Sequence, residues 1–374
     1  MKDKLASRYL PPETLEHYLK SEGDFNALAI LGYSVENRPI YGLTIGQGAK
    51  KVLAWSQMHG NETTSTKACL DLLSYLKHNK EGQELLQQIQ LLIIFQLNPD
   101  GALRYTRLNA NEIDLNRDAV AASQPEMKVL KETFLSFQPD LCLNLHGQRT
   151  IFAAGNTTTP AALSFLAPAA EETRTIPPAR LVAMQLIAQM ASDLPQESHW
   201  GIGRYDDAFN INCTGDYFTA QNTPTILFEA GHYPGDYARS KTRGLFFEAL
   251  LSCITSFARD SFTVFSAEEY HAIPSNFNHL RDIQVNNVTI VNNGNTTKAT
   301  FFVQYNELLK DNTIEFIPEY VAHDNNDLKG LVVIDANAAN QTAAINIVDS
   351  ATKILNHLKS FIEFPVLCFI FVMY

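Results

Sequence analysis

The chain has few cysteines, and none of them are grouped at a spacing that binds metal. Its 374 residues include five cysteines, and no Cys-x-x-Cys motif occurs. Zinc ribbons, iron–sulfur clusters and disulfide frameworks all need grouped cysteines, so these classes of site are poor interpretations. We expect the thiols to be small buried side chains in a reducing compartment.

A basic excess and a long apolar run are also missing. Forty acidic residues against 29 basic ones give a formal net charge of −11, which argues against nucleic-acid or anionic-membrane partners. The start of the chain lacks the apolar run of a secretory signal. The most apolar stretch, residues 361–374, contains Pro365 and is shorter than the ~20 residues of a spanning helix. We expect a cytoplasmic protein without a membrane anchor, in which this stretch is packed or lies at an interface.

Three common catalytic motifs do not occur in the chain. There is no G-x-S-x-G, no H-E-x-x-H and no G-x-x-x-x-G-K-[ST]. These absences argue against a serine hydrolase with a nucleophile elbow, a zincin and a P-loop enzyme.

Strand-like and helix-like segments alternate through the first two-thirds of the chain. Apolar runs of strand length occupy residues 51–58, 90–97, 140–145 and 225–228. Apolar side chains at helical spacing occupy residues 69–76, 127–137, 180–194 and 246–254. This order predicts an α/β fold with a mostly parallel or mixed sheet flanked by helices.

The composition changes past about residue 265. Asparagine becomes frequent, and β-branched alternation replaces the helical stripes. Asn293-Gly294 between two such runs predicts a hairpin, and one helix is expected around residues 347–361. We therefore predict two domains, residues 1–265 and a small β-rich accessory domain at 266–374.

Three motifs follow predicted strands directly. His59-Gly60-Asn61-Glu62 follows the first strand, His146-Gly147 follows the third, and Glu229 directly follows the run at 225–228. Ligands bind at the carboxyl ends of strands in open α/β sheets. Two imidazoles and one carboxylate make a His₂Glu zinc set that leaves a fourth position for water. Taken singly, each residue could instead be a histidine in a turn or a carboxylate in a cap or salt bridge.

An arginine-rich segment follows the interior strand at residues 90–97. Arg104, Arg107 and Arg117 occur within one span of 14 residues, beside an asparagine-rich stretch. Guanidinium groups suit bidentate capture of a carboxylate and stabilisation of an oxyanion. The alternative is a solvated basic patch.

The motif set resembles the zinc carboxypeptidases of the M14 (carboxypeptidase A-like) family. The motifs HGNE, NPDG, RLNANEIDLNRD, LNLHG and FEAG occur in the order of that family and cover about residues 50–235. The resemblance implies a catalytic first domain that holds one Zn²⁺ per chain through His59, Glu62 and His146. It implies a metallocarboxypeptidase that cleaves an amide bond beside a free C-terminal carboxylate, in a peptide or small amide. In that reaction Glu229 would be the general base acting on a metal-activated water.

The resemblance also implies roles for the loop residues. Arg107 would stabilise the oxyanion, and Asn116 with Arg117 would hold the terminal carboxylate of the substrate. Asp118-Ala119 departs from the DLNRN-Phe continuation common in the family. A substrate-capping tyrosine has two candidates, Tyr205 and Tyr217. Three residues near the motifs, Gln148, Arg149 and His232, either line the pocket or support it structurally.

Two other functions stay open. A zinc deacylase of the succinylglutamate desuccinylase/aspartoacylase kind also begins with an HGNE-type motif, although the complete RLNANEIDLNRD block is more peptidase-like. A catalytically silent peptide-binding module would keep only the groove. The β-rich domain could brace the catalytic domain, form a homo-oligomer contact or restrict the mouth of the cleft.

Overall fold

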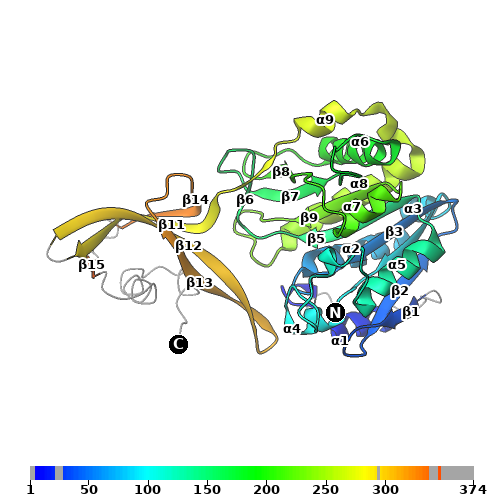
Figure 1. Cartoon of the computed structure of the whole chain (residues 1–374), viewed down its shortest axis with the longest axis horizontal. Helices are drawn as coiled ribbons and strands as arrows, with labels where there is room; N and C mark the ends of the chain where they lie inside the picture. Colours follow the sequence, from blue (N-terminus) through cyan, green and yellow to red (C-terminus); the bar gives the residue numbers. More distant parts are fainter. Residues whose placement is uncertain (1–4, 22–27, 293–294, 337–343, 347–374) are drawn as a thin grey trace. The chain divides into compact units, whose positions relative to one another are not determined.

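The computed structural model describes residues 5–21, 28–292, 295–336 and 344–346. The chain divides into two compact units (Figure 1). The first comprises Met1–Arg149 with Ala161–Asn276, and the second comprises Thr150–Pro160 with Phe277–Tyr374. The second unit therefore takes in a short segment from the middle of the first, and the two are described separately.

An eight-stranded sheet forms the centre of the first unit. Its strands are β1 (Leu28–Tyr33), β2 (Pro39–Ile45), β3 (Lys50–Ser56), β4 (Ile89–Ile94), β5 (Leu141–Gly147), β7 (Ala161–Leu166), β8 (Gly201–Arg204) and β9 (Thr225–Ala230). They lie in the order β1-β2-β4-β3-β5-β9-β7-β8. The pairs β3–β4, β3–β5, β5–β9 and β7–β8 are parallel, and the other three pairs are antiparallel. The sheet is mixed with a parallel centre, and the prediction of an α/β fold is confirmed.

Successive side chains of the central strands point to opposite faces of the sheet and pack into two separate hydrophobic cores. On β3, Val52 and Ala54 pack with the helices α2 (Thr63–His78), α6 (Pro178–Asp193) and α8 (Ser240–Arg259). Leu53 and Trp55 point to the opposite face and pack with α5 (Pro125–Phe137) and α7 (Thr214–Ala220). Helices on both faces explain why the interior strands are apolar throughout rather than alternating.

All four strands and four helices predicted from apolar patterns are present, with ends that differ by a few residues. The sequence did not predict β1, β2, β7 and β8. The remaining helical elements are α1 (Pro12–Ser21), α3 (Lys80–Leu85), α4 (Pro99–Arg104), η2 (Leu115–Arg117), η3 (Ser261–Val264) and α9 (Ala267–Ala272). Within the described residues, no helix combines the length and apolarity needed to cross a membrane.

The second unit is built on a five-stranded sheet, so a β-rich C-terminal part is present as predicted. Its strands are β11 (Leu280–Asn292), β12 (Asn295–Lys310), β13 (Thr313–His323), β14 (Lys329–Asp335) and β15 (Ala344–Asn346). β10 (Asn276–Asn278) pairs with β6 (Phe152–Ala154) in a separate ribbon. The predicted turn at 293–294, helix at 347–361 and apolar stretch at 361–374 lie outside the described residues.

The compact units divide about ten residues later than the boundary expected at 265/266. α9 extends the first unit because it packs against α6, and its Tyr270 is 0% exposed. The Tyr270 hydroxyl accepts a hydrogen bond from the Ala167 backbone N–H at 3.2 Å. Thr150 belongs to the second unit because the buried Asp282 carboxylate binds both its hydroxyl and the Gln304 side chain.

We predict that Tyr270→Ala lowers the free energy of unfolding by about 3–5 kcal/mol, because it leaves a large cavity between α9 and α6. Tyr270→Phe removes one hydrogen bond and should cost about 1 kcal/mol. Chemical denaturation of both variants measures the difference. Equal stability of Tyr270→Ala and the wild type would show that α9 is not part of the folded first unit.

Candidate active site

Two glycines bring the loop after β3 against α4. A Cβ on Gly60 would lie 1.9 Å from the carbonyl carbon of Gly101, so this close approach excludes any side chain. Asn98 fixes the same contact: its Oδ1 accepts from the Gly101 N–H at 2.8 Å, and its Nδ2 donates to the Met58 carbonyl at 3.2 Å. The HGNE and NPDG motifs therefore pack together and fix the start of α2.

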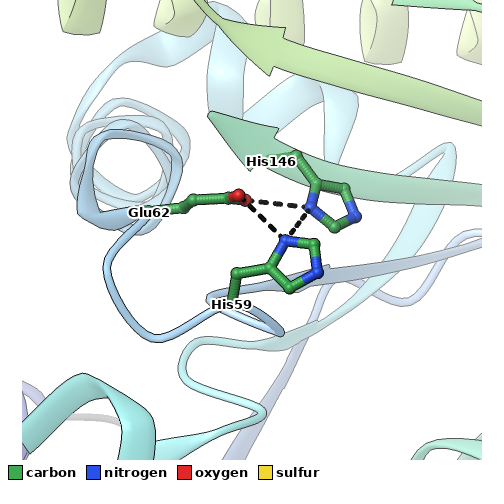
Figure 2. A group of neighbouring side chains, drawn as sticks. All are labelled: His59, Glu62 and His146. Carbon is green, nitrogen blue, oxygen red and sulfur yellow. Dashed lines mark hydrogen bonds and ion pairs between the residues drawn. The ribbon is translucent and has the colours of Figure 1, made fainter. Parts of the chain in front are cut away.

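Three side chains from separate elements point toward one another at this place (Figure 2). His59 follows β3, Glu62 is the N-cap residue of α2, and His146 lies near the end of β5. The Nδ1 atoms of the two histidines are 3.1 Å apart. Glu62 Oε1 is 2.8 Å from the first, and Oε2 is 2.9 Å from the second. Glu62 makes no side-chain cap bond to α2, so its oxygens are directed at the imidazoles.

This geometry fits a metal ion. Tetrahedral ligands at about 2.0–2.1 Å from one ion lie roughly 3.3 Å from each other, close to the separations observed. His59 and His146 are 2% and 1% exposed, so the ligand atoms are shielded from bulk water. Across the described part of the chain this is the one such group of histidine, cysteine and acidic side chains. A His₂Glu set uses three of four tetrahedral positions, which is the arrangement of catalytic zinc sites.

The neighbouring charges act differently on the three groups, and they favour the metal-binding form of two of them, Glu62 and His146. Burial disfavours the charged form of His59, but Glu62 and Asp114 outweigh it and raise its pKa. Burial lowers the pKa of His146, and Glu62 opposes this only in part. Burial alone would raise the pKa of Glu62, yet the two imidazoles hold it far below the usual value. A carboxylate and a neutral imidazole are the forms that ligate a metal.

Asp114 orients one of the predicted ligands. Its Oδ1 lies 3.0 Å from Nε2 of His59, on the ring edge away from Glu62. Its Oδ2 accepts from Nε and Nη2 of Arg107, at 3.2 and 3.0 Å. An outer carboxylate fixes the tautomer and orientation of a metal-binding histidine. The sequence showed Asp114 only as one acid within RLNANEIDLNRD, without a signal for this contact.

Arg107 lies close to the converging side chains. Its Nη1 is 3.2 Å from Nδ1 of His59 and 3.6 Å from Oε1 of Glu62. Arg104 is directed elsewhere: it forms an ion pair with Glu36 and donates to the Asp100 carbonyl. The arginine-rich segment is therefore not a uniform basic patch.

Strand register places Glu229 beside His146. The two residues are partners in the parallel pairing of β5 and β9, so their side chains lie on the same face of the sheet. Glu229 Oε2 is buried and has no hydrogen-bond partner among the described residues. Burial, and then the charge of Glu62, raise the pKa of Glu229 well above its usual value, with Arg107 and Arg239 opposing. A carboxyl group with a raised pKa beside a metal site is suited to proton transfer.

Asn116 and Arg117 belong to η2 and contact the residues at which α7 begins. Asn116 Oδ1 accepts from the backbone N–H of Thr214 at 3.0 Å and from its hydroxyl at 2.5 Å. Arg117 is exposed and donates to Sγ of Cys213 at 3.2 Å. Burial raises the pKa of the Cys213 thiol, and the charges of Arg117, Asp114 and Arg107 all act on it. Arg117 therefore acts on the same thiol as Asp114 and Arg107, the two charged residues that contact His59.

The structure separates the two candidate tyrosines. Burial, and then the charges of Glu229 and Glu62, raise the pKa of Tyr205. Tyr217 instead packs edge-on against Phe218 beneath the ammonium group of Lys131. Of the two candidates, Tyr205 is thus the one whose pKa responds to the carboxylates of this site.

Two of the other candidate residues, Gln148 and His232, have structural contacts. Gln148 is buried and donates to the Ala161 carbonyl at 3.0 Å. Arg149 is exposed, and His232 is buried with its ring against Tyr237. Asp118, where the chain departs from the family pattern, accepts from the backbone N–H groups of residues 123 and 124 and so closes its own loop.

Residues 13–119 match the family model described as zinc carboxypeptidase. This part of the chain is similar to the zinc carboxypeptidase family. The matched region includes His59, Glu62, Arg107, Asn116 and Arg117, and it ends before His146 and Glu229.

Relatives of the family show similarity over part of the chain. A probable carboxypeptidase 2 of Arthroderma benhamiae is 33% identical over 113 residues, which is 29% of this chain and 21% of that protein. The corresponding protein of Trichophyton verrucosum is 31% identical over 115 residues, 30% of this chain and 21% of its own. The match thus spans about a fifth of the length of these curated relatives.

Solved structures of the family share the fold. A metallo-carboxypeptidase from Pseudomonas aeruginosa has a TM-score of 0.55 at 18% identity, covering 68% of this chain and 71% of that one. A carboxypeptidase A from Helicoverpa armigera has a TM-score of 0.55 at 19% identity, covering 67% and 74%.

We predict that Zn²⁺ binding to the metal-free protein weakens as the pH falls. A histidine binds metal in its neutral form, and the pKa of His59 is raised above its ordinary 6.5. A proton on His59 therefore competes with Zn²⁺ at a higher pH than a proton on an ordinary histidine does. The affinity for Zn²⁺ should fall about tenfold per pH unit below that raised pKa. Titration calorimetry between pH 5.5 and 8 measures this, with the exposed-histidine variant His271→Ala as control. An affinity independent of pH, or one unaffected by His146→Ala, would contradict the ligand assignment.

Proposed function

We propose that the protein is a metallocarboxypeptidase that uses one zinc ion per chain. The observation that carries this proposal is the convergence of His59, Glu62 and His146, with Glu229 beside His146 in strand register. The catalytic machinery lies in the first unit. Its substrate is a peptide or small amide with a free C-terminal carboxylate.

His59, Glu62 and His146 would hold the ion. When bound, zinc polarises a scissile carbonyl and lowers the pKa of water in its open position. Glu229 accepts a proton on its buried Oε2 and returns it to the leaving amine, a task supported by its raised pKa. Arg107, fixed by two bonds to Asp114, offers its remaining donors to negative charge that develops on the carbonyl oxygen.

Three further residues would position the substrate. Arg117 binds the terminal carboxylate through its exposed guanidinium, and Asn116, oriented by Thr214, supports the same group. Tyr205, whose pKa responds to the charges of Glu229 and Glu62, would close over a bound substrate.

The decisive assay compares three substrates on the zinc-loaded protein: a blocked dipeptide with a free C-terminus, its C-terminal amide, and an acyl-amino acid such as succinylglutamate. We expect the free dipeptide to be preferred over its amide by about 10–100-fold in kcat/KM, since the amide loses a charge-assisted hydrogen bond to arginine. Arg117→Met should remove this preference, whereas Arg104→Met, from the same segment, should keep it. Hydrolysis of the acyl-amino acid alone would favour the deacylase, and binding without turnover the silent module.

We predict that Glu229→Gln lowers kcat by about 10²–10⁴-fold, the usual contribution of a general base. Zinc content should stay unchanged, because Glu229 is not among the three converging ligands. Steady-state kinetics with metal analysis measure both quantities, and Glu132→Gln on the exposed side of α5 is the matched control. A variant that keeps its turnover would remove Glu229 from the mechanism.

A further inference from the structure

One buried arginine has no part in the proposed chemistry. Arg239 is 4% exposed and is the N-cap residue of α8. Its Nη1 donates to the carbonyl oxygens of Ala230, at 2.6 Å, and Gly231. Its Nη2 donates to the carbonyl oxygen of Gln148 at 2.8 Å.

These three carbonyls lie at the ends of the two strands that carry the site, or one residue beyond them. Ala230 and Gly231 come directly after Glu229 on β9, and Gln148 comes two residues after His146 on β5. The last backbone bond of this strand pair runs from the Gln148 N–H to the Ala230 carbonyl at 2.9 Å. The guanidinium therefore connects β5 and β9 at the point where the backbone hydrogen bonds between these two strands end.

The loop from β9 to α8 holds Arg239 in this place. The Asp236 carboxylate accepts from the backbone N–H groups of residues 240, 241 and 242. The Thr242 hydroxyl donates to the Gly231 carbonyl at 3.3 Å. Arg239 itself adopts φ of +62°, a left-handed conformation that L side chains avoid unless the surroundings impose it.

We propose that Arg239 is a positioning residue that fixes the Glu229 carboxylate relative to the His146 imidazole. The inference rests on the proposed function of these two residues. A shift of about 1 Å between catalytic groups can cost two orders of magnitude in rate, so a bond across both strand ends has a direct effect on turnover. Arginine suits the task because its rigid planar fork can donate to both strands at once, which the single ammonium group of lysine cannot do in the same geometry.

The experiment uses the full-length, zinc-loaded protein and three variants, Arg239→Met, Arg239→Lys and Arg239→Ala with added guanidinium chloride. Arg243→Met is the control, because Arg243 lies one turn further along α8 and also donates to a main-chain carbonyl, that of Leu5. Each protein is measured for kcat, KM, zinc content and melting temperature. Amide hydrogen exchange is measured at residues 148, 231 and 232.

We expect Arg239→Met to lower kcat by about 10–100-fold, with KM within twofold and zinc content unchanged. Exchange at the three amides should accelerate in Arg239→Met and not in Arg243→Met. Arg239→Lys should recover part of kcat, and millimolar guanidinium should raise the kcat of Arg239→Ala. If Arg239→Met does not fold, the lysine and guanidinium measurements decide alone.

Two results would overturn the inference. One is a folded, zinc-loaded Arg239→Met that keeps kcat within threefold of the wild type. The other is an equal loss of kcat in Arg239→Met and Arg243→Met, in step with their melting temperatures, which would indicate a structural role alone. Failure of the proposed function is separate, since it would appear as an inactive wild type. In that case the exchange rates still show whether Arg239 joins the two strand ends.

Discussion

β5 lies between β3 and β9 in the sheet, and all three run parallel. Their carboxyl ends therefore meet at one edge, where a histidine that follows β3, a histidine on β5 and a glutamate on β9 come within reach of each other. Glu62 completes the group because the turn after β3 is short and packs tightly against α4. The candidate metal centre, the outer carboxylate Asp114 and the position of Arg107 all depend on this strand order.

Two buried carboxylates in this small volume have opposite electrostatic surroundings. Two imidazoles surround Glu62 and keep it ionised, although burial opposes this. Glu229 has no such partner among the described residues, and burial together with the charge of Glu62 shifts its pKa upward. A pair of acids whose pKa values are shifted in opposite directions by their environment is the pattern by which enzymes separate a charge-stabilising role from a proton-transfer role.

Hydrogen bonds also fix the backbone that leaves this edge of the sheet. Gln148 is bound at its backbone N–H, its carbonyl and its amide group, so the end of β5 has little freedom before the chain enters the second unit at Thr150. The chain returns to the first unit at Ala161, where β7 begins and pairs with β9. The second unit is thus connected by sequence to both strands that flank Glu229.

Local signals in the sequence determined the interior strands, the long helices and the β-rich C-terminal part, since apolar periodicity reports which side chains are buried within one element. They also indicated His59, Glu62, His146 and Glu229, because each follows a predicted strand. Only the tertiary structure decided that Asp114 orients His59 and that Arg104 turns away from the site. It alone showed Arg239 across two strand ends. These contacts join residues far apart in the chain, and they depend on strand order and register, which no single segment encodes.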